Sequence, residues 1–248
     1  MRMRAVRMVP LLLLMALTAA CGPSKAPRAP GTAFAAQLSD SPPSDTRAEA
    51  FGAAPDAPTL RLMFVGASVT EGWFASARNR AYPALVTRSL QASGRRVRVR
   101  LLAHPGATAA DADHWDLAIA SDVVVVQIAT NDWVTGVPLA TFDTEYADML
   151  RRLRLTSATA DLICFGAWED PSSVNKIGVA ALSYDQAVRS ACDAEDGRYI
   201  DLSGVYMDPL DHGPEGRVTF HGPGDVFHPN DRGHQELASL ILADGDLP

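Results

Sequence analysis

The sequence has no uninterrupted block of basic residues, and its 29 acidic side chains outnumber its 22 lysines and arginines. Nucleic-acid-binding proteins need clustered positive charge against the phosphates, so this composition argues against such a partner. The sequence also contains no internal repeat and no apolar run long enough to favour a membrane-spanning helix. These absences leave an ordinary globular domain as the expectation.

Cysteine and histidine are scarce as well, with three cysteines and six histidines in 248 residues. Four of the histidines lie close together near the end of the chain, but their spacing matches no common zinc pattern. We therefore expect no metal ion and no other cofactor. The last of the four is most simply a packed, hydrogen-bonded side chain of the final helix. The four are His212, His221, His228 and His234.

The N-terminal residues follow one another in the order typical of an export signal. Basic residues at positions 2, 4 and 7 precede the apolar stretch 9–17, and small residues then precede Cys21. This order is typical of a secretory signal peptide, here 1–21. A cysteine directly after small residues also resembles the lipobox of bacterial lipoproteins, although Thr18 stands where leucine is usual. We expect export with lipidation at Cys21, and the alternative is ordinary cleavage by a signal peptidase.

Residues 22–58 differ in composition from the rest of the chain. Seven prolines fall within these 37 residues, and valine, isoleucine, tryptophan and tyrosine are absent. A segment that cannot build an apolar core is expected to be a disordered tether. The remaining residues, 59–248, suffice for one domain. Removal of 1–21 takes away three arginines, so the mature chain carries 19 basic and 29 acidic side chains, a net charge of −10.

Within 59–248, short apolar segments alternate with segments of helical periodicity. Strands are expected at 60–65, 97–102, 122–128, 162–165 and 199–202, the second near a sheet edge and the third buried on both faces. Helices are expected near 84–90, 142–153 and 231–242, and 183–186 fits a capping box that opens another. The alternation predicts an α/β fold, a three-layer α/β/α sandwich with a central, mostly parallel five-stranded sheet.

The first predicted strand is followed by a candidate nucleophile. The apolar run 60–65 ends at Gly66, which we expect to adopt backbone angles that a residue with a side chain resists. Ser68 follows at the carboxyl end of the strand, where ligands bind in open α/β sheets. On this stretch alone, Ser68 is more simply a helix cap or a turn residue. The second glycine of a G-x-S-x-G elbow is missing, which argues against an α/β-hydrolase.

Two further loops and one turn add residues that complement Ser68. Gly106 and Asn131 follow the second and third predicted strands, and loops after parallel strands meet at one edge of the sheet. Asp225 and His228 precede the last helix at a spacing that lets the carboxylate orient the ring while its other nitrogen faces Ser68. A base activates a serine hydroxyl, and aligned N–H groups stabilise the oxyanion that follows. The set therefore predicts acyl transfer.

These motifs resemble those of the SGNH (GDSL-like) hydrolase family, whose name lists its serine, glycine, asparagine and histidine. The similarity covers nearly all of 60–243, with blocks at 66–68, 106, 129–132 and 225–230. It implies a flavodoxin-like α/β/α fold and carboxylic ester hydrolysis.

The resemblance also assigns roles to individual residues. It implies that Ser68 is the nucleophile, His228 the base and Asp225 the partner of the base. The oxyanion hole is then formed by Ser68, Gly106 and Asn131.

Two positions depart from the family pattern. Ala67 stands where the family often has aspartate, and Ala129 stands where the third block usually has glycine. Neither change removes a group that the chemistry requires, so both bear on substrate contacts more than on activity.

Several aromatic residues follow predicted strand ends and are candidates for substrate contacts. Trp73, Phe74, Trp133 and Trp168 could line an acyl or sugar pocket, or equally form lids over the core. We select Trp73 and Trp133 as substrate-binding candidates.

Cys164 and Cys192 are expected on the fourth strand and on the inward face of a helix. In an oxidising compartment such a pair is more often bridged than free, and a helix packed on a sheet can bring the two together. Two separate buried thiols remain the alternative. We select the disulfide, although sequence cannot supply the distance.

The resulting prediction is an exported serine esterase that hydrolyses carboxylic esters through an acyl-enzyme on Ser68. Short-chain acyl esters and acetylated carbohydrates are the expected substrates. The membrane is expected as a partner only through an N-terminal lipid anchor. The alternatives are an acyltransferase that uses the same residues and a non-catalytic glycan-binding lipoprotein. The pairing of Asp225 with His228 argues against a pure binder, which has no use for it.

Overall fold

The computed structural model describes residues 58–243 and 247, and every structural statement below concerns these residues. The predicted signal, Cys21 and nearly all of the predicted tether lie outside them. No helix in the described part of the chain is long and apolar enough to cross a membrane.

A five-stranded sheet forms the centre of the domain, and all of its neighbouring strands are parallel. The five predicted strands and the sandwich architecture are confirmed. The edge position of the second strand and the full burial of the third are confirmed as well. In spatial order the strands are β2 (Arg96–Ala103), β1 (Thr59–Gly66), β3 (Val123–Gln127), β4 (Asp161–Phe165) and β5 (Arg198–Ile200).

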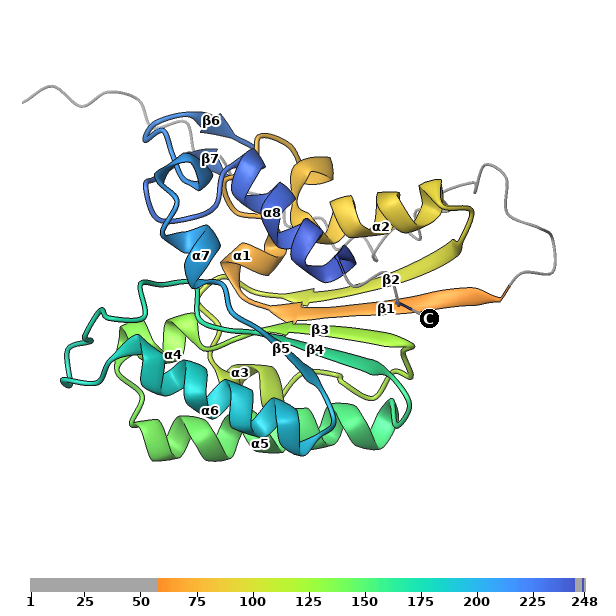
Figure 1. Ribbon diagram of the computed structural model, residues 1–248, viewed down its shortest axis with the longest axis horizontal. Coiled ribbons are helices and arrows are strands. Elements are labelled where there is room, and N and C mark those ends of the chain that lie inside the picture. The colour runs from red at the N-terminus through yellow and green to blue at the C-terminus, as the bar shows by residue number, and fades with distance from the viewer. Residues whose placement is uncertain (1–57, 244–246, 248) are drawn as a thin grey trace, which may run out of the picture. The chain divides into compact units, whose positions relative to one another are not determined.

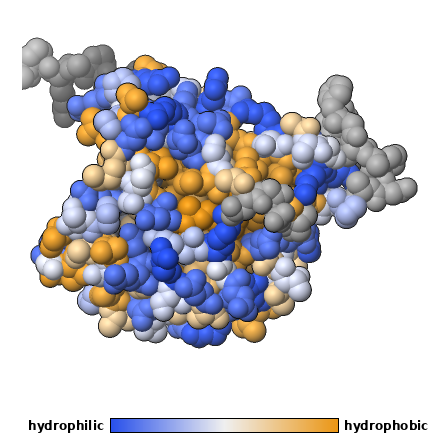
Figure 2. All heavy atoms as spheres, viewed as in Figure 1, coloured by the Kyte–Doolittle hydropathy of each residue, from blue (hydrophilic) through white to orange (hydrophobic). Residues whose placement is uncertain are grey.

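Helices cover both faces of this sheet, as Figure 1 shows. Alternate side chains of each strand point to opposite faces, so the apolar residues of the sheet divide between two cores. One core lies under α2 (Tyr82–Ala92) and α8 (Asp231–Leu242). The other lies under α3 (Ala109–Asp113), α5 (Leu139–Thr156) and α6 (Ala181–Ala194). On the face shown in Figure 2, hydrophilic side chains predominate over the two helical layers, and apolar ones show in the band between them.

The shorter elements gather around the carboxyl ends of the strands (Figure 1). The helical ones are α1 (Ser68–Glu71), α4 (Thr130–Thr135), α7 (Ser203–Tyr206), η1 (Arg78–Arg80) and η2 (Pro209–Asp211). A small antiparallel hairpin of β6 (Val218–Thr219) and β7 (Gly222–Pro223) lies between η2 and the last helix in sequence. This concentration of turns at one sheet edge is the setting of the candidate site.

The predicted capping box at 183–186 is wrong. Helix α6 begins at Ala181 without a side-chain cap, so Ser183 already lies inside its first turn. The carboxylate of Asp185 instead accepts a hydrogen bond from the backbone N–H of Ala167 at 2.7 Å. A capping box is found at α3, where Thr108 and Asp111 bond each other's backbone N–H.

The prediction that Gly66 adopts backbone angles unfavourable for other residues is also wrong, although the strand does end there. Gly66 does not have a positive φ. A Cβ at this position would lie 1.9 Å from Oγ1 of Thr70, because α1 folds back over the end of β1. Glycine is therefore required by space and not by backbone angle.

A disulfide joins Cys164 to Cys192, with the two Cα atoms 6.2 Å apart. It links β4 to α6 and lies within the core on the face of the sheet that α6 covers. The expected inward orientation of Cys192 follows directly from this bond.

Candidate active site

The register of the sheet brings three loops to the same level. Gly66 at the end of β1 pairs with Ala103 of β2 on one side and with Gln127 of β3 on the other. Because all three strands are parallel, the segments that follow leave the sheet at one edge. The predicted site residues come within four residues of these positions: Ser68, Gly106 and Asn131.

Ser68, His228 and Asp225 form a continuous chain of hydrogen bonds. The Oγ atom of Ser68 lies 3.0 Å from Nε2 of His228, and Nδ1 of the same ring lies 2.9 Å from Oδ2 of Asp225. The carboxylate fixes the proton on Nδ1, which leaves Nε2 free to accept the hydroxyl proton of Ser68. The arrangement has the distances that a serine nucleophile and its base require.

Hydrogen bonds within the turn from Asp225 to His228 stabilise its conformation. Oδ1 of Asp225 accepts hydrogen bonds from the backbone N–H of Phe227 at 3.0 Å and of His228 at 2.8 Å. One carboxylate thus orients both the backbone and the ring of His228. This is the physical reason for the D-x-x-H spacing.

The pKa values of the pair favour a neutral base beside an ionised acid. Burial lowers the pKa of His228, and the neighbouring Asp225 only partly opposes that effect, so the pKa lies below the ordinary value of 6.5. Partial burial pushes the pKa of Asp225 upward, but hydrogen bonds from His228 and Phe227 outweigh it and hold the pKa below its ordinary value. At neutral pH the imidazole can therefore accept a proton.

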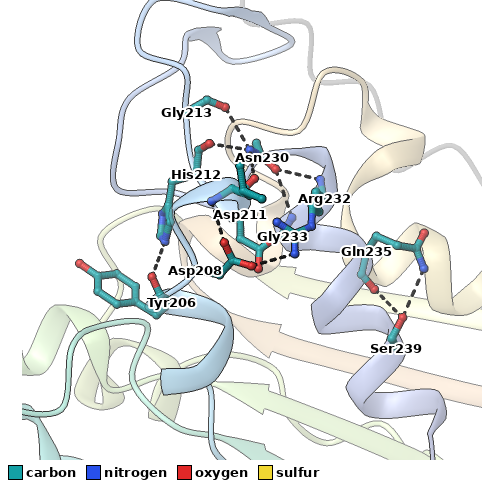
Figure 3. A network of polar contacts seen from close by, with 11 residues as sticks. Tyr206, Asp208, Asp211, His212, Gly213, Asn230, Arg232, Gly233, Gln235 and Ser239 are labelled. Atoms are coloured by element: carbon teal, nitrogen blue, oxygen red, sulfur yellow. Dashed lines mark hydrogen bonds and ion pairs between the residues drawn. The ribbon is translucent and has the colours of Figure 1, made fainter.

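Asn230 anchors this turn to the rest of the domain (Figure 3). Its Oδ1 caps α8 by accepting hydrogen bonds from the backbone N–H of Arg232 and Gly233, and its Nδ2 donates to carbonyls of the preceding loop, including that of His212 at 2.5 Å. The loop 210–213 and the start of α8 are thereby held together, and His228 lies just before this junction.

Asn131 lies on α4 and reaches across to the loop after β2. Its side-chain amide donates one hydrogen to the carbonyl of Ala107 at 2.9 Å. The amide nitrogen carries a second hydrogen, which remains available for an oxyanion. Gly106, next to Ala107, is exposed and has a φ of +81°, a conformation that favours glycine. The contact therefore ties two of the oxyanion-hole candidates to one another.

Asp132 also supports this loop, although the sequence motifs assign it no role of its own. It is fully buried, and Oδ1 accepts a hydrogen bond from the backbone N–H of Ala109 at 3.1 Å. Burial raises its pKa to about 7, and the nearby acidic residues Glu145 and Asp111 add to this effect. The feature of the sequence that points to Asp132 is its position directly after Asn131. Consecutive residues of α4 thus hold the segment that follows Gly106.

Ala129, which stands where the family pattern usually has glycine, adopts an unusual backbone conformation. This residue precedes α4 with a φ of +148°, a region that residues with a side chain rarely adopt. It is also buried, so the surrounding structure must hold it there. Ala67, the other departure, precedes α1 with a negative φ.

The aromatic candidates separate into two groups. Trp73 and Phe74 are half-buried beside the ring of His228, with centroids 5.4 and 4.8 Å from its own. Trp133 is buried in the core under α5 and α6, and its indole N–H donates to the carbonyl of Val179, so its selection as a substrate contact is contradicted. Trp168 is also buried and donates to the carbonyl of Phe227 at 2.7 Å.

The other histidines are occupied by contacts within the domain. His234 is fully buried with Nε2 at 3.0 Å from the carbonyl of Trp73, which confirms the prediction of a packed, hydrogen-bonded ring. Burial lowers its pKa to about 4. His221 lies against Trp73, and His212 bonds the carbonyl of Phe227. Within the described ranges, no cluster of three or more His, Cys, Asp or Glu side chains is arranged to hold a metal ion.

Comparison with known families gives one match. The sequence model described as "GDSL-like Lipase/Acylhydrolase family" matches residues 64–236, a range that contains every member of the Ser68 site. A search of curated proteins gave no match.

Several solved structures share the fold at low sequence identity. One is a carbohydrate esterase family 2 enzyme with a carbohydrate-binding domain from Corynascus thermopiles (Myceliophthora fergusii), with 12% identity, a TM-score of 0.57, and coverage of 77% of this chain and 67% of that chain. Another is the psychrotrophic esterase EstA from Pseudoalteromonas sp., with 10% identity, a TM-score of 0.55, and coverage of 74% and 94%. A third is the salicylyl-acyltransferase SsfX3 from a tetracycline biosynthetic pathway, with 15% identity, a TM-score of 0.57, and coverage of 78% and 57%.

Proposed function

Because the chain belongs to the GDSL-like lipase/acylhydrolase family, whose activity is the hydrolysis of carboxylic esters, we propose that it is an exported serine esterase working through an acyl-enzyme on Ser68. The observation that carries this proposal is the hydrogen-bond chain from Asp225 through His228 to Ser68. Such a chain is what turns a serine hydroxyl into a nucleophile.

In the acylation step, Nε2 of His228 takes the proton of Ser68 as Oγ bonds to the ester carbonyl carbon. The resulting imidazolium is stabilised by Asp225, and the carbonyl oxygen becomes an oxyanion. Collapse of this intermediate breaks the bond to the alcohol oxygen, which receives the proton from His228. The alcohol leaves, and the acyl group remains on Ser68.

Deacylation repeats the same proton transfers with water. His228 removes a proton from a water molecule as the water oxygen attacks the acyl carbon, and returns it to Oγ of Ser68 as the new intermediate collapses. The products are the free carboxylic acid and the regenerated serine. Both steps balance with the ester, water and the side chains of the protein alone.

The oxyanion formed in both steps needs donors that are already in place. The backbone N–H groups of Ser68 and Gly106 and the second amide hydrogen of Asn131 are the proposed donors. The bond from Asn131 to Ala107 and the bond from Ala109 to Asp132 support this assignment, since they fix the loop before the substrate arrives.

We propose short-chain acyl esters and acetylated carbohydrates as the substrates. Trp73 and Phe74 lie against the catalytic ring and offer apolar faces on which an acyl group or a sugar ring can pack. The fold similarity to a carbohydrate esterase supports a carbohydrate alcohol as one candidate.

Export remains part of the proposal, with Cys21 as the proposed lipidation site. The bond between Cys164 and Cys192 supports it independently of the N-terminal sequence, because disulfides persist mainly in oxidising compartments.

The test is a screen with p-nitrophenyl esters of increasing acyl length, followed by acetylated polysaccharides. We expect release of acid from the short esters by the wild type and none above background by Ser68→Ala. Ser93→Ala is the matched control, because Ser93 is an exposed serine that ends α2 and bonds only a local carbonyl. Near-full activity in Ser68→Ala contradicts the mechanism.

An acyltransferase is the second candidate, supported by the fold similarity to a salicylyl-acyltransferase. It uses the same acyl-enzyme but transfers the acyl group to an alcohol instead of water. Product analysis with an excess of acceptor alcohol separates the two activities. Accumulation of the new ester at the expense of free acid would favour the transferase.

A further inference from the structure

His212 lies behind the catalytic turn with both of its ring nitrogens facing carbonyl oxygens. Nδ1 lies 2.8 Å from the carbonyl of Phe227, and Nε2 lies 2.6 Å from the carbonyl of Tyr206. Figure 3 shows the second of these contacts, at the end of α7. Both distances are those of good hydrogen bonds.

A neutral imidazole cannot make both contacts as hydrogen bonds. It carries one N–H, and its other nitrogen presents a lone pair, whereas a carbonyl oxygen is only an acceptor. One of the two contacts would then place a lone pair against a lone pair at less than 3 Å. The two contacts are satisfied together when both ring nitrogens carry a proton.

The surroundings favour a cation at this position. The ring centroid of His212 lies 5.2 Å from that of Trp168 and 5.1 Å from that of Tyr206, and the latter two are 5.4 Å apart, so the three rings form one cluster. Aromatic rings attract cations. Carboxylates outnumber cations around this segment. The charged and titratable groups there are Tyr206, Asp208, Asp211, Glu169, Asp170, Arg232, Glu236 and His228.

The contact acts on the catalytic turn itself. The carbonyl of Phe227 belongs to the peptide that leads into His228, and it accepts hydrogen bonds from both His212 and Trp168. An isolated β-bridge between His212 and Pro229 holds the other side of the same turn. The backbone on either side of His228 is therefore bonded to or bridged by His212.

We propose that His212 is a positioning residue that acts as an imidazolium, bridging the carbonyls of Phe227 and Tyr206 and thereby holding His228 in line with Ser68. The catalytic part of this inference rests on the proposed esterase function. The charge state and the effect on the His228 ring do not, and they can be measured in a protein that shows no esterase activity.

The first experiment measures the charge state directly. Spectra of ¹⁵N-histidine-labelled protein at neutral pH, with His212→Gln used for assignment, report whether each ring nitrogen carries a proton. We expect His212 to show two protonated nitrogens while His228 is neutral. A neutral tautomer at His212 overturns the proposal, whatever the enzyme hydrolyses.

The second experiment measures positioning with His212→Phe, which keeps an aromatic ring against Trp168 and Tyr206 but donates no hydrogen bond. His212→Gln retains one donor group, and His114→Gln is the control, because His114 is exposed at the end of α3. We expect the Nδ1 proton signal of His228 to broaden or shift in His212→Phe and to stay unchanged in the control.

The same variants separate positioning from simple loss of stability when they are assayed as esterases. We expect kcat to fall about 10- to 100-fold in His212→Phe with KM little changed, and less in His212→Gln, because a displaced base slows the chemical step. A wild-type kcat together with an unchanged His228 signal in His212→Phe overturns the positioning role.

Discussion

Asp225 shows how much of the candidate site depends on one side chain. It accepts hydrogen bonds from two backbone N–H groups of its own turn and from Nδ1 of His228. The ring orientation and the backbone conformation that sets it therefore have a common origin. Substitution at Asp225 should affect the direction of the ring as well as its proton affinity.

The first residue-scale prediction concerns pH. Burial lowers the pKa of His228 below 6.5, and a base must be neutral to accept the proton of Ser68. We expect kcat/KM for an ester to rise with pH and to level off, with the midpoint of the acid limb below 6.5.

Asp225→Asn tests whether the pKa of His228 sets the acid limb of this pH profile. Asp225 raises the pKa of His228, so its removal should move the midpoint further down while kcat falls, though less than in His228→Ala. A midpoint that moves to higher pH in Asp225→Asn would contradict this account of the pair.

Asn131 provides the second residue-scale prediction. Asn131→Ala should lower kcat by about 10²- to 10³-fold with little change in KM, because a donor to the oxyanion acts mainly in the transition state. Val134→Ala on the same helix is the control, since its side chain is about half exposed. If Asn131→Ala instead raises KM and leaves kcat unchanged, Asn131 is a substrate contact.

The third residue-scale prediction concerns the strained alanine before α4. Ala129→Gly should raise the free energy of unfolding by about 1 kcal/mol, because glycine adopts a φ of +148° at no steric cost. Ala187→Gly, in the middle of α6, should lower it by a similar amount, about 1 kcal/mol. Urea unfolding measures both, and destabilisation by Ala129→Gly would show that the strain is not relieved.

At the scale of elements, the order of strands and helices could be predicted because hydrophobic periodicity depends on neighbours in sequence. The last helix was placed at 231–242, where α8 is found. The start of α6 could not be placed, since a serine followed by a glutamine three residues later also occurs within a helix. Trp133 was misplaced for a related reason: following a strand does not reveal whether a side chain turns inward or outward.

The element-scale prediction concerns the bond between β4 and α6. We expect no reactive thiol in the unfolded, unreduced protein that lacks residues 1–21. Cys164→Ala combined with Cys192→Ala should lower the free energy of unfolding by about 3.6 kcal/mol, on the loop-entropy argument for residues 28 positions apart. Two reactive thiols per chain would contradict the disulfide.

At the scale of the whole molecule, the site is assembled from the two halves of the described sequence. Ser68, Gly106 and Asn131 come from the first three βα connections, while Asp225 and His228 come from the turn before the last helix. Their approach was predictable because parallel strands deliver their loops to one edge. The supporting contacts of Trp168 and His212 were not predictable, because they depend on tertiary distances between loops that carry no motif.

The fold alone does not distinguish hydrolysis from transfer, since similar folds occur in esterases and in an acyltransferase. What both activities share is a covalent acyl group on one serine. That intermediate is the central claim of the proposed mechanism.

The most direct measurement is to trap the intermediate and locate it. The protein is mixed with an activated short-chain ester, quenched in acid within the first turnover, digested and mapped by mass spectrometry. We expect one acyl group per chain, on Ser68, and none in Ser68→Ala. An acyl group on another residue, or rapid ester cleavage by Ser68→Ala with no adduct, would contradict it.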